Sequence, residues 1–210
     1  MKTDKKSSDI VGMLKDAGIL LVITVVAGLL LGLVYQVTKE PIAIQKQKAK
    51  QEACKEVFKE AASFEEVEWK QPKEQTWAEA GYAQESIDEV MTAHDAAGSI
   101  LGYVITVTTK EGYGGDIRFT IGIQADGTIN GISILEIAET AGLGMRAEEV
   151  LKPQFAGKNV EKFEYTKYGA VSDYQIDAIS GATITTNAVT NGVNAGIYYF
   201  QTELRGGSAE

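Results

Sequence analysis

One stretch near the N-terminus constrains the fold of this chain more than any other. Residues 17–35 read AGILLVITVVAGLLLGLVY, a run of 19 residues without a charged side chain. A helix needs roughly 20 apolar residues to cross the hydrocarbon core of a bilayer. The run therefore predicts a transmembrane helix over residues 17–36, which follows a polar tail over residues 1–16.

Two other interpretations of the apolar run are weaker. A signal peptide has a shorter apolar region and a small-residue cleavage site, whereas this run continues into Gln-Val-Thr-Lys-Glu-Pro. A buried core helix of a soluble protein usually keeps polar residues on one face. Lysines flank both ends of the run, for example at Lys15 and Lys39. Counting positive charges therefore does not fix the orientation in the membrane.

The segment after the run has the period of an amphipathic helix. We expect a juxtamembrane linker helix over residues 37–62, with Pro41 in its first turn. One face of that helix is apolar and contains Ala53, Cys54, Val57, Phe58 and Ala61. Residues 63–90 are acidic and have only a weak hydrophobic period, so we expect a partly irregular segment that precedes the β region.

A β region follows, in which β-branched residues alternate with polar ones. The pattern predicts three strands, over residues 99–109, 117–124 and 128–137. A glycine-rich turn over residues 110–115 separates the first two, and Asp126-Gly127 is a hairpin turn between the last two. Turns rather than helices join these strands, so the sheet should be antiparallel.

The remaining elements complete a prediction of the α+β class. A helix is expected over residues 145–152, and residues 153–175 should form a loop with one short strand. From Thr183 onward, Val189, Val193 and Ile197 recur at helical spacing. Helices should therefore flank the antiparallel sheet.

Composition excludes several classes of function. The formal net charge is −9, and nucleic-acid binding needs a basic surface. The chain has one cysteine and one histidine, so it cannot form an internal disulfide or build a Cys- or His-based metal or iron–sulfur site by itself. It contains neither a GxGxxG fingerprint nor a P-loop. We expect Cys54 to be a buried packing residue and His94 to lie in a loop.

The most informative string is Asp177-Ala-Ile-Ser180-Gly181-Ala182-Thr183. Its small side chains would let a planar ligand approach the backbone closely. With Thr185 or Thr186 as the N-cap of the following helix, Thr183 would lie beside a helix N-terminus, which favours a phosphate. From spacing alone, an ordinary Gly-Ala turn and threonine cap is the preferred interpretation, because short Ser/Gly/Thr strings are common.

The order of residues in this string resembles the flavinylation signature of the FMN-binding domain family. That family includes the G subunit of the Rnf ion-translocating ferredoxin:NAD oxidoreductase and the C subunit of the sodium-translocating NADH:quinone reductase. The segment Glu139-Thr140-Ala141-Gly142-Leu143-Gly144 also resembles the family, whose version commonly has a proline where Ala141 stands. The shortness of the chain favours the Rnf type over the quinone reductase type.

The resemblance implies that FMN is attached through its phosphate to the hydroxyl of Thr183. Further cofactor-binding residues that it implies are Ser180, Gly181, Ala182, Thr185, Glu139, Thr140, Gly142, Leu143, Gly144 and Tyr113. An alternative for Tyr113 is an exposed residue of the turn. Asp177 is either recognised by the FAD:protein FMN transferase that matures the protein or caps the turn. No residue is assigned a catalytic or metal-binding role.

The resemblance also implies a place in the cell and a set of partners. We expect a single-pass protein of the cell (inner) membrane, with a cytoplasmic N-terminus, an extracytoplasmic FMN-binding domain over residues 63–205 and a disordered tail over residues 206–210. It would relay electrons between iron–sulfur and integral membrane flavin subunits, without a complete activity of its own. The alternatives are a membrane-tethered FMN redox sensor outside such a complex and a structural membrane-anchored domain without a cofactor.

Overall fold

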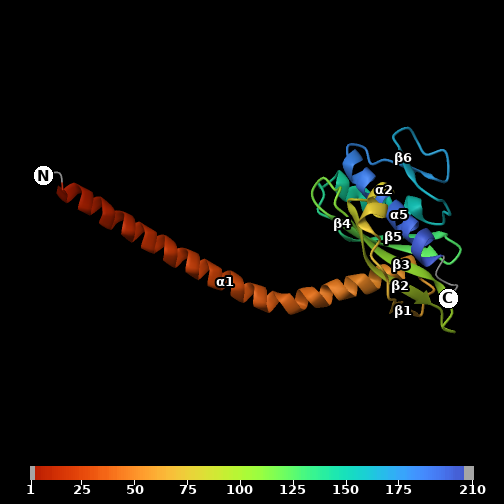
Figure 1. Cartoon of the computed structure of the whole chain (residues 1–210), viewed down its shortest axis with the longest axis horizontal. Coiled ribbons are helices and arrows are strands. Elements are labelled where there is room, and N and C mark those ends of the chain that lie inside the picture. Colours follow the sequence, from red (N-terminus) through yellow and green to blue (C-terminus); the bar gives the residue numbers. More distant parts are fainter. Residues whose placement is uncertain (1–2, 206–210) are drawn as a thin grey trace. The chain divides into compact units, whose positions relative to one another are not determined.

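The computed structural model describes residues 3–205, which belong to two compact units that meet between Lys48 and Ala49. The predicted tail over residues 206–210 lies outside the described residues. Helix α1, Thr3–Val57, begins in the first unit and ends in the second (Figure 1). Its most apolar window of 18 residues has a mean hydropathy of 2.8. The large apolar side chains between residues 19 and 37 are exposed, as expected for a helix that a bilayer surrounds.

The two helices predicted for this region form one continuous helix. Pro41 lies inside α1, so the prediction of a separate linker helix with Pro41 in its first turn was wrong. No glycine lies in the turn before the proline to end the first helix, and a proline inside a helix removes only one backbone donor. The helix ends at Val57, before the predicted end at residue 62.

The second unit is built on a five-stranded antiparallel sheet in which each strand pairs with its neighbour in the sequence. Its strands are β1 (Ser63–Glu66), β2 (Glu85–His94), β3 (Ile100–Thr109), β4 (Ile117–Gln124) and β5 (Ile129–Glu136). The three predicted strands and their antiparallel pairing are confirmed. Gly127 has φ +96° in the turn between β4 and β5, as the Asp126-Gly127 hairpin signal requires.

The segment over residues 63–90 contains more regular secondary structure than its sequence predicted. It contains β1, the short helix α2 (Glu74–Glu79) and most of β2. The register of β2 shifts between Ile87 and Glu89, so Asp88 forms a bulge that interrupts the alternation of side chains. His94 is the last residue of β2 and not part of a loop.

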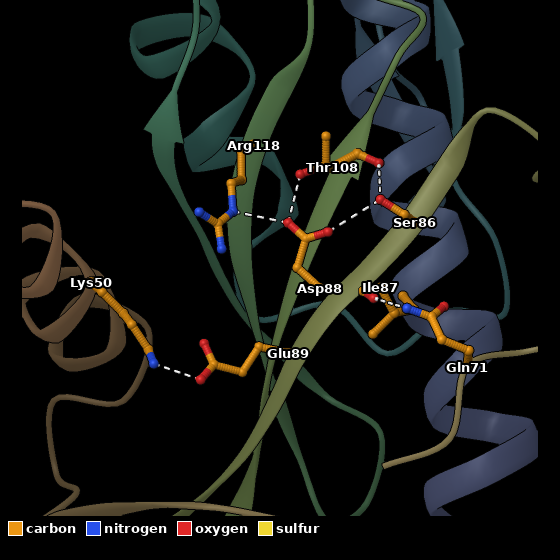
Figure 2. A network of polar contacts seen from close by, with 8 residues as sticks. All are labelled: Lys50, Gln71, Ser86, Ile87, Asp88, Glu89, Thr108 and Arg118. Carbon is orange, nitrogen blue, oxygen red and sulfur yellow. Dashed lines mark hydrogen bonds and ion pairs between the residues drawn. The ribbon is translucent and has the colours of Figure 1, made fainter. Parts of the chain in front are cut away.

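A polar network surrounds the bulge in β2 (Figure 2). The Asp88 carboxylate accepts hydrogen bonds from Thr108 Oγ1 at 2.6 Å, Arg118 Nε at 2.9 Å and Ser86 Oγ at 3.1 Å. These bonds join β2 to β3 and β4. The neighbouring Glu89 pairs with Lys50 Nζ at 2.5 Å, which attaches the end of α1 to the same strand.

The region between the sheet and the last helix departs from two predictions. The helix expected over residues 145–152 consists of three short pieces, η1 (Gly144–Arg146), α3 (Ala147–Val150) and α4 (Lys152–Phe155). Pro153 in the first turn of α4 cannot donate the hydrogen bond that would continue α3. Where one short strand was expected, β6 (Glu164–Thr166) and β7 (Gln175–Asp177) form a parallel pair.

Helix α5, Thr183–Tyr199, packs on one face of the sheet and continues into η2, Phe200–Leu204 (Figure 1). A Cβ atom at Gly196 would overlap with Ile121 Cδ1. On the opposite face, a Cβ atom at Gly122 would lie 2.7 Å from Val57 Cβ, at the end of α1. Glycine therefore sets the close approach of a helix on each face of β4. Cys54 is buried, as predicted.

Candidate functional site

A cavity of about 540 Å³ opens where three segments far apart in the sequence meet. The segments are the turn after β3, the loop after β5 and the start of α5. The lining residues are Tyr113, Glu139, Thr140, Leu143, Gly144, Gly181, Ala182, Thr183, Ile184 and Thr185. The volume lies within the range of roughly 300–1,000 Å³ that is typical of small-molecule sites.

Glu139 holds two walls of the cavity together. Its side chain is buried, and its Oε1 accepts hydrogen bonds from the backbone N–H groups of Tyr113 at 2.7 Å and Gly114 at 3.3 Å. The carboxylate thereby fixes the turn after β3 against the loop after β5. Bonds from a carboxylate to backbone N–H groups are among the stronger hydrogen bonds in proteins, so this contact positions Tyr113 at the cavity.

Two glycines allow the other walls to approach each other. A Cβ atom at Gly144 would lie 2.5 Å from Thr185 Oγ1 and 2.8 Å from Glu139 Oε2. Gly181 has φ +78°, and a Cβ atom there would lie 3.1 Å from Leu143 Cδ2. The loop after β5 therefore packs directly against the start of α5.

The start of α5 presents unprotected backbone donors to the cavity. The helix begins at Thr183, and the residue before it, Ala182, has no side chain that can cap the first turn. The prediction that Thr185 or Thr186 is the N-cap was wrong, because both lie inside the helix. Thr186 Oγ1 instead accepts a hydrogen bond from Ile179 N at 3.1 Å and donates to Ala182 O at 2.9 Å. The half-buried Thr183 thus lies at the positive end of the helix dipole.

Three of the residues predicted for the site do not line the cavity. Ser180 is exposed beside it, and Gly142 forms an exposed turn with φ +75°. Asp177 ends β7, and its Oδ1 accepts a hydrogen bond from Ala170 N at 2.7 Å. The Asp177 side chain therefore caps the loop between β6 and β7, and not the turn that precedes Thr183.

Two residues that the sequence did not single out contribute to the site. The exposed Ile184 adds apolar surface to the cavity. Glu111 Oε2 accepts hydrogen bonds from Asn191 Nδ2 at 2.7 Å and Asn187 Nδ2 at 3.2 Å, which ties the turn after β3 to α5. The spacing of the two asparagines places them on one face of a helix, but only the fold shows that Glu111 is their partner.

The arrangement suits a flat ligand that carries a phosphate. Tyr113, Leu143 and Ile184 provide exposed apolar surface around the cavity. The uncapped N–H groups at the start of α5 provide donors for an anion. Thr183 is the first residue of this helix and lines the cavity.

Two family profiles match the chain. The FMN-binding domain family matches residues 112–198, and the RnfG N-terminal region matches residues 5–57. The first match contains every residue that lines the cavity. The second contains the apolar part of α1.

Named relatives resemble the chain over most of its length. It is 36% identical over 187 residues to the G subunit of the Na(+)-translocating ferredoxin:NAD(+) oxidoreductase complex of Acetobacterium woodii, covering 87% of this chain and 89% of that one. It is 31% identical over 185 residues to the G subunit of the ion-translocating oxidoreductase complex of Methanosarcina acetivorans, covering 86% and 90%. Among solved structures, Shewanella oneidensis NqrC aligns with a TM-score of 0.45 and 24% identity, over 54% of this chain and 58% of that one.

Proposed function

The chain belongs to the family of G subunits of ion-translocating oxidoreductase complexes, and from this membership we infer that it relays electrons within such a complex. It is a membrane-anchored protein with an FMN-binding domain. FMN can accept and release electrons one at a time, and the protein supplies the binding site and its polarity. The chain therefore carries electrons between other subunits of an oxidoreductase complex.

We propose that FMN is bound through its phosphate to Thr183. The observation that carries this proposal is the position of Thr183, at the uncapped start of α5 and on the wall of the cavity. A phosphate there would receive backbone N–H donors and the favourable end of the helix dipole. Gly144, Gly181 and Ala182 would leave room for the ring system, and Leu143 would cover part of it.

Attachment requires a catalyst from outside the chain. A threonine hydroxyl is a weak nucleophile without an adjacent base, and His94 lies at the end of β2, outside the cavity wall. We propose that an FAD:protein FMN transferase performs the step. The Thr183 oxygen loses its proton to the solvent and forms a bond to the phosphorus of the FMN half of FAD, the pyrophosphate bond breaks, and AMP leaves. Asp177 is exposed, so the transferase can recognise its side chain.

The partners and the orientation complete the proposal. Iron–sulfur and integral membrane flavin subunits would supply and accept the electrons. The FMN-binding domain would lie outside the cell membrane and the N-terminus in the cytoplasm. A tagged full-length chain should therefore copurify with these subunits from membranes, whereas a free-standing redox sensor would be recovered without them.

The proposed attachment predicts a specific change in mass. Full-length protein made together with the transferase should gain the mass of one FMN less water and should be yellow. Thr183→Ala should abolish the added mass and the colour, because the acceptor oxygen is gone. Thr183→Ser keeps a hydroxyl at the same position and should retain both. Intact-mass and peptide mass spectrometry measure this, and covalent flavin in the alanine variant would contradict the assignment.

A further inference from the structure

Glu85, the first residue of β2, is a buried acid with an unpaired oxygen. Its residue surface is 5% exposed. Oε1 accepts a hydrogen bond from Thr109 Oγ1 at 3.2 Å. Among the described residues 3–205, Oε2 is the one buried side-chain oxygen or nitrogen atom without a hydrogen-bond partner. A buried carboxylate is costly without partners, whereas the protonated acid leaves no charge to stabilise.

The groups that face Glu85 favour the protonated form. Burial, followed by the negative charge of Glu111, raises the pKa of Glu85 to about 7. The other titratable group against it is Tyr82, which precedes β2, and Tyr198 of α5 packs on Tyr82 with ring centroids 5.6 Å apart. Burial, followed by the negative charge of Glu85, raises the pKa of Tyr82 above its ordinary value, so Tyr82 carries no charge near pH 7. Glu111 is therefore the charge that acts most directly on Glu85.

A short chain of contacts leads from Glu85 to the cavity. Thr109 Oγ1 donates to Glu85 and accepts a hydrogen bond from Glu111 N at 3.3 Å. The Glu111 carboxylate is in turn bound by Asn187 and Asn191 of α5. Asn187 lies four residues after Thr183, one helical turn away on the same face. Glu111 thus lies between the buried acid and the helix end that forms the cavity wall.

We propose that Glu85 is a proton-binding site coupled through Glu111 to the flavin cavity, and that it takes up a proton when the cavity gains negative charge. The inference rests on the proposed binding of FMN. An electron that arrives from a reduced iron–sulfur or flavin donor adds one negative charge to the cavity. One proton from water then binds to the Glu85 carboxylate, so the charges balance and no other bond forms or breaks. Glu85 acts at a distance and does not touch the cofactor.

The first measurement tests the proton site without flavin. In the full-length Thr183→Ala protein in detergent micelles, infrared spectra between pH 5 and 9 should contain a protonated-carboxyl band that disappears with a midpoint near neutral pH. Glu85→Gln in the same background should remove this band. Glu111→Gln should move its midpoint to lower pH, because the neighbouring charge is gone. A band that is unchanged in the Glu85→Gln protein would overturn the proposal.

The second measurement tests the coupling in the flavin-bearing protein. The midpoint potential of the flavin, titrated with dithionite from pH 6 to 8.5, should fall more steeply with pH in the wild type than in Glu85→Gln. The matched control Glu161→Gln, which alters an exposed carboxylate, should follow the wild type. Equal slopes in the wild type and Glu85→Gln would overturn the coupling.

The two measurements separate the failure of this inference from the failure of the proposed function. A normal infrared band in the Thr183→Ala protein, together with a wild-type chain that acquires no FMN when it is made with the transferase, contradicts the flavin attachment and leaves the proton site standing. A flavin-bearing chain without the band, or with equal slopes, contradicts the role of Glu85 and leaves the attachment standing.

Discussion

Glu85 should give the stability of the domain an unusual dependence on pH. Its pKa rises from an ordinary value of 4.5 to about 7 in the folded chain, so the folded state binds the proton more tightly than the unfolded state. The contribution to the free energy of unfolding is therefore complete below about pH 4.5 and is lost as the pH rises through 7. Its size is at most about 3 kcal/mol.

Glu85→Gln provides the comparison that isolates this contribution. The variant should unfold at nearly the same denaturant concentration as the wild type at pH 5. At pH 8.5 it should be the more stable of the two, because an amide carries no buried charge. Denaturant unfolding at the two pH values measures the difference, and an equal loss in both proteins would contradict the expected titration.

A methyl group added at Gly144 should disturb the wall of the cavity. The added Cβ of Gly144→Ala would lie 2.5 Å from Thr185 Oγ1, so the loop after β5 must move away from α5. We expect a loss of roughly 1–3 kcal/mol, the usual cost of overpacking, together with less flavin attached per chain. Met145→Ala, at an exposed neighbouring position, should change neither. Thermal unfolding and flavin absorbance are the measurements.

At the scale of elements, the distance between α5 and the sheet depends on glycine. Gly196→Ala would raise helix propensity by about 1 kcal/mol, but its Cβ would overlap with Ile121 Cδ1. We expect the steric overlap to outweigh the gain in helix propensity, so Gly196→Ala should be less stable than the wild type. Ile121→Val removes the Cδ1 atom, so the double variant should recover part of the loss. A double-mutant cycle measures this coupling, and purely additive effects would contradict the close approach.

The elements that depend on local pattern were predictable, and those that depend on tertiary contacts were not. Strand β4 followed from the alternation of Ile117, Phe119, Ile121 and Ile123, and its turn followed from Asp126-Gly127. Strand β2 was missed because the bulge at Asp88 breaks its period.

The start of α5 and the surroundings of the cavity show the same division. The N-cap was misplaced because the Thr186 hydroxyl bonds to Ile179 N, a contact that spacing does not reveal. Most residues of the cavity wall were predicted from the resemblance to the family, and not from the spacing or chemistry of the residues themselves. The sequence did not reveal that Ile184 lines the cavity or that Asn187 and Asn191 bind Glu111, because each contact depends on segments that meet only in three dimensions.

At the scale of the whole molecule, the proposed orientation can be tested with thiol labelling. Cys54 is the only cysteine and is 2% exposed, so it should react slowly with a maleimide. Tyr168 is 97% exposed in the second unit, and Lys15 is exposed in the first. A membrane-impermeant maleimide should label Tyr168→Cys in intact spheroplasts and Lys15→Cys only after permeabilisation. The reverse pattern would contradict an extracytoplasmic flavin domain.

The pairing of every strand of the main sheet with its neighbour in the sequence has a consequence for biogenesis. Contacts that are local in sequence form early, so the hairpins of the sheet can assemble before the C-terminal part of the chain is available. Helix α5 follows all five strands of that sheet in the sequence, so we expect it to pack on the sheet after the strands have paired. On this order of assembly, the segment with Thr183 would stay accessible until α5 packs on the sheet, which would give the proposed transferase an interval in which to act.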